Sequence, residues 1–69
     1  MILIFFTDIL NEAYKGIATT LLNNLEGMTR WSIDLEDIDK VLRVEATRDI
    51  STEIVVILTQ SGFKCIYMV

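Results

Sequence analysis

The sequence contains no histidine and only one cysteine among its 69 residues. Without histidine, neither a Ser/His nor a Cys/His nucleophile pair can form, and no glycine-rich phosphate loop is present. A single cysteine excludes a disulfide within the chain and fits a reducing compartment. Six basic residues against ten acidic ones leave a net charge of −4, which opposes contact with nucleic-acid phosphates. We therefore predict a protein that is not an enzyme and binds no nucleic acid.

Long hydrophobic runs are also missing. The apolar run Met1–Phe6 is too short to cross a bilayer, and it has neither a basic leader nor a small-residue cleavage site. A buried strand is the simpler interpretation of this run. We expect a cytoplasmic protein without a membrane partner.

Apolar residues are plentiful, at 52% of the chain, so a folded core is expected rather than disorder. The length allows a single domain that spans residues 1–69. A core this small is marginally stable, and a partner or a second copy often supplements it.

The first half of the chain predicts a strand and then a helix. The β-branched and aromatic run Ile2–Phe6 is apolar on both alternating faces, which predicts a central strand covered on both sides. From about Glu12 to Leu25, apolar residues recur at steps of three and four and predict a helix, capped by Asp8 or Asn11 and closed by Gly27. Its apolar stripe comprises Tyr14, Ile17, Ala18, Leu21, Leu22 and Leu25.

A hairpin is predicted next. Alternating apolar and polar residues favour a strand over residues 31–36, a turn over 36–40 and a returning strand over 41–46. Trp31 is expected to anchor the core. The core side of the returning strand is assigned to Leu42, Val44 and Ala46.

The remaining segment predicts a second helix over about residues 51–61, ended by Gly62, and a last strand over residues 63–69. Asp49 or Ser51 offers an N-terminal cap for this helix. The order strand, helix, strand, strand, helix, strand predicts an α+β, ferredoxin-like βαββαβ fold. Its four-stranded antiparallel sheet would carry both helices on one face and leave the other face open.

Three segments resemble the heavy-metal-associated domains, a family that includes copper chaperones and small domains of metal-pumping ATPases. The first is Leu22–Met28, which has the family's pattern of leucine, two polar residues, leucine, glutamate and glycine. The second is Trp31–Glu36, which is similar to the strand that follows this pattern in the family. The third is Ser61–Phe63, which resembles the family's glycine-aromatic pair before the last strand. The resemblance covers the chain from about Ile9 to Val69 and implies the same fold.

The resemblance places the family's metal loop on residues 9–14, with the two cysteine positions at Asn11 and Tyr14. Cu(I) is a soft ion that thiolates and thioethers hold, whereas an amide is a hard, weak ligand and a phenol stays protonated near pH 7. We therefore predict no metal ligand and no cofactor at this loop. Asn11 is interpreted as a helix cap and Tyr14 as a residue of the core or its edge.

Two other groups are candidate metal ligands. Cys65 is the only thiol, and as a residue of the last strand it is expected to be buried like a small hydrophobe. Four carboxylates lie in the predicted turn region, but their spacing lacks the EF-hand pattern and its glycine, so a solvated hairpin end is expected. They are Asp34, Glu36, Asp37 and Asp39.

Two hypotheses about function follow. The first is a protein-interaction or dimerisation module, in which another protein or a second copy binds the open sheet face or an edge strand. On the last strand, either Ile66 and Met68 or the alternate residues must then point outward. The alternative is a metal-binding or metallochaperone-like protein with atypical ligands. In that alternative, Cys65 pairs with a thiol of a second chain, or Asp8 and Glu12 hold a harder ion.

Overall fold

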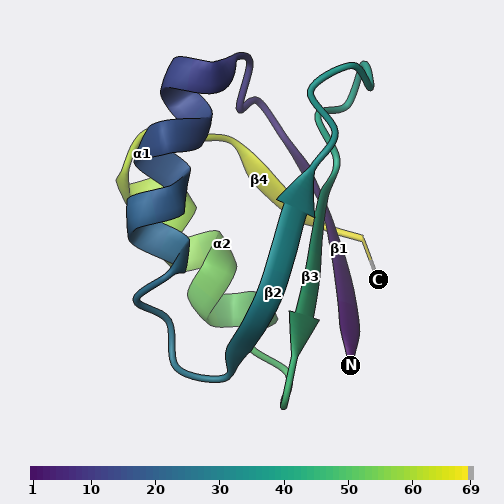
Figure 1. The fold of residues 1–69 in the computed structure, drawn as a ribbon, viewed down its shortest axis with the longest axis vertical. Coiled ribbons are helices and arrows are strands. Elements are labelled where there is room, and N and C mark those ends of the chain that lie inside the picture. The colour runs from purple at the N-terminus through teal and green to yellow at the C-terminus, as the bar shows by residue number, and fades with distance from the viewer. Residues whose placement is uncertain (69) are drawn as a thin grey trace.

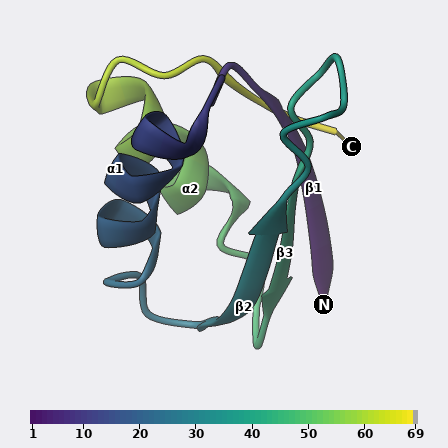
Figure 2. The same ribbon diagram turned by 45° about the horizontal axis from the view of Figure 1, so that its top comes forward.

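The computed structural model describes residues 1–68 and has the predicted order of elements. The elements are β1 (Ile2–Thr7), α1 (Glu12–Leu22), β2 (Met28–Ile33), β3 (Leu42–Ala46), α2 (Ser51–Gln60) and β4 (Cys65–Tyr67). The sheet has the strand order β2-β3-β1-β4, and each neighbouring pair is antiparallel. Both helices cover one face of the sheet (Figure 1, Figure 2). The predicted ferredoxin-like fold is confirmed.

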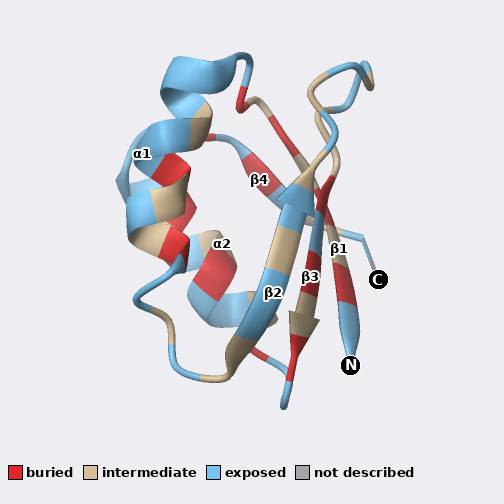
Figure 3. Cartoon of the chain, viewed as in Figure 1, coloured by how far each residue is buried: buried red, intermediate tan, exposed pale blue. Residues whose placement is uncertain are grey.

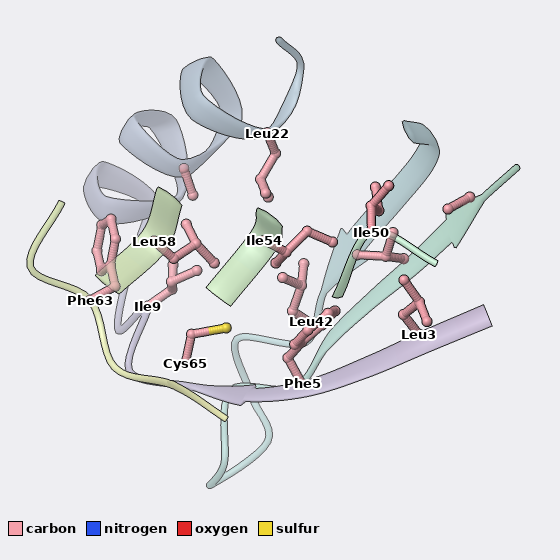
Figure 4. Packing of buried hydrophobic residues seen from close by; sticks show 13 residues of the cluster. Leu3, Phe5, Ile9, Leu22, Leu42, Ile50, Ile54, Leu58, Phe63 and Cys65 are labelled. Atoms are coloured by element: carbon pink, nitrogen blue, oxygen red, sulfur yellow. The ribbon is translucent and has the colours of Figure 1, made fainter. Parts of the chain in front are cut away.

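The core lies between the helices and the sheet, as Figure 4 shows. Phe5 at the centre of β1 has no exposed surface, and α1 and α2 each contribute two buried residues. The fully buried large side chains are Leu3, Phe5, Ile9, Leu22, Leu42, Val44, Ile50, Ile54 and Leu58. The predicted core side of residues 41–46 is confirmed, since Leu42, Val44 and Ala46 are all buried.

The prediction that the first strand is covered on both sides was wrong. Strand β1 is central, but only its helix-facing residues are buried, and Ile2, Ile4 and Phe6 alternate with them as exposed or half-buried residues (Figure 3). Two helices on a four-stranded sheet cover one face only, so the apolar residues of the other face remain in contact with solvent.

Helix α1 ends three residues earlier than predicted. Asn23 caps it by donating its backbone N–H to the carbonyl of Thr19, and the following residues form turns. Gly27 adopts the left-handed conformation (φ +91°), but it lies in the loop that leads to β2 and does not close the helix. The stripe was also too wide, because Ile17 is 51% exposed.

The boundaries of the hairpin also differ from the prediction. Strand β2 begins at Met28, where a bulge between Met28 and Arg30 lets it pair with β3, and it ends at Ile33. The connecting loop therefore begins at residue 34. Trp31 is half-buried at the rim of the core, and its Nε1 donates to Oδ1 of Asn23 over 3.1 Å. Phe5, not Trp31, is the large aromatic at the centre of the core.

The end of the chain follows the prediction more closely. Helix α2 has Ile50 at its N-cap position without a side-chain capping bond, although Oδ1 of Asp49 accepts from the backbone N–H of Ser51. Gly62 (φ +93°) turns the chain after the helix, as predicted. Strand β4 is limited to three residues, and Val69 of the predicted last strand lies outside the described residues. None of the helices among residues 1–68 is long and apolar enough to cross a membrane.

Candidate functional site

The loop between β1 and α1 lies at one end of the molecule, together with the β2–β3 loop (Figure 1). Asn11 is extended there (φ −157°, ψ 177°), and its Oδ1 accepts from the backbone N–H of Tyr14 over 3.0 Å. This bond satisfies an amide that the first turn of a helix leaves free. The interpretation of Asn11 as a helix cap is confirmed.

Tyr14 lies at the edge of the core, as predicted, with 41% of its surface exposed. Its ring packs edge to face against Phe63, with ring centroids 5.9 Å apart and an interplanar angle of 82°. Leu10 is 58% exposed beside it, and both side chains line a shallow surface hollow of about 220 Å³. The two positions at which the resemblance places thiols are thus an amide bound to backbone and an aromatic ring.

Thr7 joins this loop to the segment that precedes β3, and sequence reasoning missed it. Its hydroxyl donates to the carbonyl of Lys40 over 2.6 Å and accepts from the backbone N–H of Ile9 over 3.3 Å. Its own N–H donates to the carbonyl of Asp39. The only available signal was one hydroxyl at the end of an apolar strand.

Asp8 ties the same loop to the segment before β4. Its Oδ1 accepts from the backbone N–H of Lys64 over 2.7 Å, and its own N–H donates to the carbonyl of Lys64 over 3.3 Å. Asp8 and Glu12 are the two carboxylates that would hold a harder ion in the metal-binding hypothesis. Across residues 1–68, no three side chains of the His, Cys, Asp and Glu types come together in a group that could hold a metal ion.

Cys65 is buried, as predicted, and forms no disulfide. It faces Thr7 across the β1–β4 pair, and its side chain lies between the sheet and the helices (Figure 4). Burial, together with the charge of Asp8, raises the pKa of the Cys65 thiol to about 11. Metal binding and disulfide exchange both use the thiolate, so this environment opposes both reactions.

The acidic loop between β2 and β3 uses part of its charge to fix its own turn. Oδ1 of Asp34 accepts from the backbone N–H groups of Glu36 and Asp37, and Oδ1 of Asp37 accepts from Asp39. Such short-range bonds are typical of polar turns. Ile38, between these acidic residues, is 93% exposed.

The helices leave the other face of the sheet, its open face, uncovered (Figure 1, Figure 2). We call its β1–β4 part the apolar strip, which comprises Ile2, Ile4, Phe6, Ile66 and Met68. Ile2, Ile66 and Met68 are 46%, 48% and 45% exposed. Phe6 faces Ile66 in register, and the N–H of Met68 donates to the carbonyl of Ile4, so the strip is continuous across both strands.

The β2–β3 part of the same face is polar. Arg30, Ser32, Arg43 and Glu45 occupy its open side, opposite the core residues of the same strands. Oε2 of Glu45 lies 2.6 Å from Nε of Arg30 and 3.6 Å from Nη1 of Arg43. The hydrogen bond from Arg30 lowers the pKa of the Glu45 carboxyl, and both guanidinium charges act in the same direction. The Glu45 carboxylate therefore forms ion pairs with both guanidinium groups.

Two solved structures are similar to the chain over nearly its whole length. The N-terminal domain of ZntA in its Zn(II) form matches with a TM-score of 0.81 at 15% identity, covering 96% of this chain and 89% of that one. The yeast copper transporter domain Ccc2a, solved in apo and Cu(I)-loaded states, matches with a TM-score of 0.81 at 21% identity, covering 99% and 94%. No protein-family model and no curated protein sequence matches the chain. The fold is thus that of heavy-metal-associated domains.

Proposed function

We propose that this chain is a non-catalytic, cytoplasmic protein-interaction module that binds another protein through the open face of its sheet. The observation that carries the proposal is the apolar strip, a continuous set of five apolar side chains on β1, on β4 and at Met68, which no helix or strand among residues 1–68 covers. Contiguous exposed apolar surface of this kind is typical of binding sites rather than of inert surface.

The side chains of the loop between β1 and α1 support an interaction module over a carrier of soft metal ions. The carbonyl oxygen of the Asn11 side chain is engaged by the helix backbone, and Tyr14 is engaged by Phe63. The only cysteine of the sequence is Cys65, which is buried and has a raised pKa. A Cu(I) or Zn²⁺ ion at this loop would lack the pair of thiolates that such ions favour.

The second candidate function is metal binding through atypical ligands. It is favoured by one observation, the likeness of the fold to the ZntA domain in its Zn(II) form and to the Ccc2a domain in its apo and Cu(I)-loaded states. Titration of the reduced protein with Cu(I), Zn²⁺ and Ni²⁺ tests it. Tight one-to-one binding would establish metal handling, whereas substoichiometric or millimolar binding would end that hypothesis.

The interaction module is tested by photo-crosslinking in the cells from which the sequence derives. A benzophenone amino acid replaces Phe6 on the open face in one variant and Ile17 on the exposed side of α1 in the matched control. The proposal expects one defined adduct from position 6 and none from position 17. Equal adducts from both positions, or no adduct from position 6, would contradict it.

A further inference from the structure

We infer that the open face binds an amphipathic α-helix of a different protein, with the helix's apolar stripe on the apolar strip and a carboxylate between Arg30 and Arg43. This inference rests on the proposed function and names the chemistry of the partner. On the β2–β3 part of the open face, two arginines share one glutamate, so positive charge is in excess there.

The imbalance lies at Glu45, which is the ion-pair partner of both arginines in the described part of the chain. The side chains of Arg30 and Arg43 are 77% and 49% exposed. A guanidinium carries five N–H donors, so one shared carboxylate leaves most of them directed at solvent. The two arginines line a shallow hollow of about 220 Å³ together with Trp31, Ser32 and Glu45. A carboxylate of a partner protein would balance the remaining positive charge and accept hydrogen bonds from the guanidinium N–H groups that Glu45 does not engage.

The charge of the whole molecule makes this face distinctive. The strand residues of the open face include two arginines and one glutamate, a net charge of +1. The chain as a whole carries −4, so all other residues together carry −5. The open face is therefore a positively charged surface on an acidic protein, and electrostatic steering favours an acidic partner at this face.

The same charges argue against other occupants. Two copies joined face to face would bring four arginines together with only two glutamates, so a second copy is a poor partner. Single-stranded RNA recognition on a sheet of this type uses aromatic residues of the central strands for stacking, and β3 has none.

The register of the strands sets the dimensions of the ligand. Ser32, Arg43, Ile4 and Met68 lie in one row across the sheet, because Arg43 pairs with both Ser32 and Ile4, and Met68 bonds to Ile4. Arg43 and Met68 are thus two strand spacings apart, about 10 Å. An α-helix with its side chains is also about 10 Å wide. One helix therefore reaches the apolar strip and Arg43 at the same time.

The acidic loop sets the direction of the charge on that helix. Residues 34–40 lie beyond the end of the β2–β3 pair where Ile33 meets Leu42, whereas Arg30 and Glu45 lie toward the opposite end. Carboxylates of the partner are attracted near Arg30 and repelled near Asp34 and Asp37. A helix with its acidic flank toward Arg30 satisfies both conditions.

The test uses a synthetic amphipathic peptide of about 16 residues, with a leucine stripe flanked on one side by glutamates. A matched peptide carries lysines in place of the glutamates. Amide chemical shifts of the protein report the binding site, and fluorescence anisotropy reports Kd. We expect the glutamate peptide to shift amides of β1 and β4 and to bind about tenfold more tightly than the lysine peptide.

Protein variants separate charge from apolar contact. Arg43→Glu should weaken binding of the glutamate peptide about tenfold, and Arg48→Glu, an exposed arginine paired with Glu53 away from the open face, should leave it unchanged. Ile66→Thr should weaken both peptides, whereas Ile17→Thr, at a similarly exposed position on α1, should weaken neither. Amide spectra of each variant establish that it is folded.

Several results would overturn the inference. They are equal binding of the two peptides, an unchanged Kd for Arg43→Glu, amide shifts confined to the helices, saturable binding of single-stranded RNA at the open face, or a dimer formed through that face. No saturable binding up to about 1 mM peptide would overturn it as well. A partner crosslinked at position 6 and lost in Ile66→Thr, but indifferent to Arg43→Glu, would leave the proposed function intact.

Discussion

Replacing Thr7 with valine removes a hydroxyl and changes the shape of the side chain very little. Thr7 is 8% exposed, and its hydroxyl binds the carbonyl of Lys40 and the N–H of Ile9. Valine would leave both backbone groups without this partner in a site that water reaches poorly. The carbonyl of Lys40 matters most, because Lys40 has a φ of +46°, a left-handed conformation that side chains other than glycine rarely adopt.

The magnitude follows from the two bonds. Each buried backbone group that loses its partner costs about 1–3 kcal/mol, and the weaker 3.3 Å bond belongs at the low end of this range. We expect Thr7→Val to lower the free energy of unfolding by about 2–3 kcal/mol. For a domain of this size, that is a fall in Tm of about 10–20 °C, and in urea a midpoint lowered by about 2 M.

Urea unfolding followed by circular dichroism measures the effect, with two controls. Thr7→Ser keeps the hydroxyl and loses one methyl group, so it should cost about 1 kcal/mol. Thr20→Val removes an exposed hydroxyl whose contact with the carbonyl of Gly16 is 3.5 Å, so it should change stability by less than about 0.5 kcal/mol. If Thr7→Val were as stable as the parent chain, the hydroxyl would not be the tie that the geometry indicates.

Four further predictions concern Asn11, the pair Gly16 and Gly27, and Cys65. Asn11→Ala should lower the free energy of unfolding by about 1 kcal/mol because the cap is lost, and Asn11→Ser should restore most of it in the same urea assay. Gly16→Ala should raise the free energy of unfolding by about 0.5–1 kcal/mol, since α1 has open space at that position. Gly27→Ala should lower the free energy of unfolding, because Gly27 has a φ of +91° and a Cβ would lie 3.2 Å from a side-chain carbon of Ile50. Equal effects of the two variants on Tm would refute this contrast. Because burial raises the pKa of Cys65 from 9.0 to about 11, its thiolate population at pH 8 should be about 100-fold smaller than in the unfolded chain, and iodoacetamide should react correspondingly more slowly with the native protein than in urea. The raised pKa also makes stability depend on pH. The contribution of the neutral Cys65 thiol to the free energy of unfolding is complete below pH 9.0 and is lost as the pH rises through about 11. A Cys65→Ala variant should therefore lose less stability than the parent chain between these two pH values.

The order of elements could be predicted because hydrophobic periodicity is a local property. Alternation correctly indicates the buried side of β3, at Leu42, Val44 and Ala46. Helical spacing correctly indicates the buried side of α1, at Ala18 and Leu22. The ends of elements depend on contacts that are distant in sequence. The start of β2 at Met28 depends on pairing with Ala46 across a bulge, and no local pattern around Met28 indicates that pairing.

The candidate site divides in the same way. The role of Asn11 was predictable, because a helix cap is decided within four residues of chain. The role of Thr7 was not, since its main partner is Lys40, 33 positions away. The arginine pair was also missed, because Arg30 and Arg43 meet Glu45 only through the register of β2 and β3. For the predicted last strand, the sequence left open which of two sets of residues faces outward, and the structure places Ile66 and Met68 on the open face.

The bond from Trp31 to Asn23 gives the molecule a natural optical reporter. Trp31 is the only tryptophan of the chain, so its intrinsic emission reports only the corner where β2 meets the end of α1. Detachment of that helix would expose the indole to water and move its emission to longer wavelength. A variant whose emission stays at the parent wavelength has therefore kept this corner packed, so one fluorescence spectrum shows whether α1 is still in place.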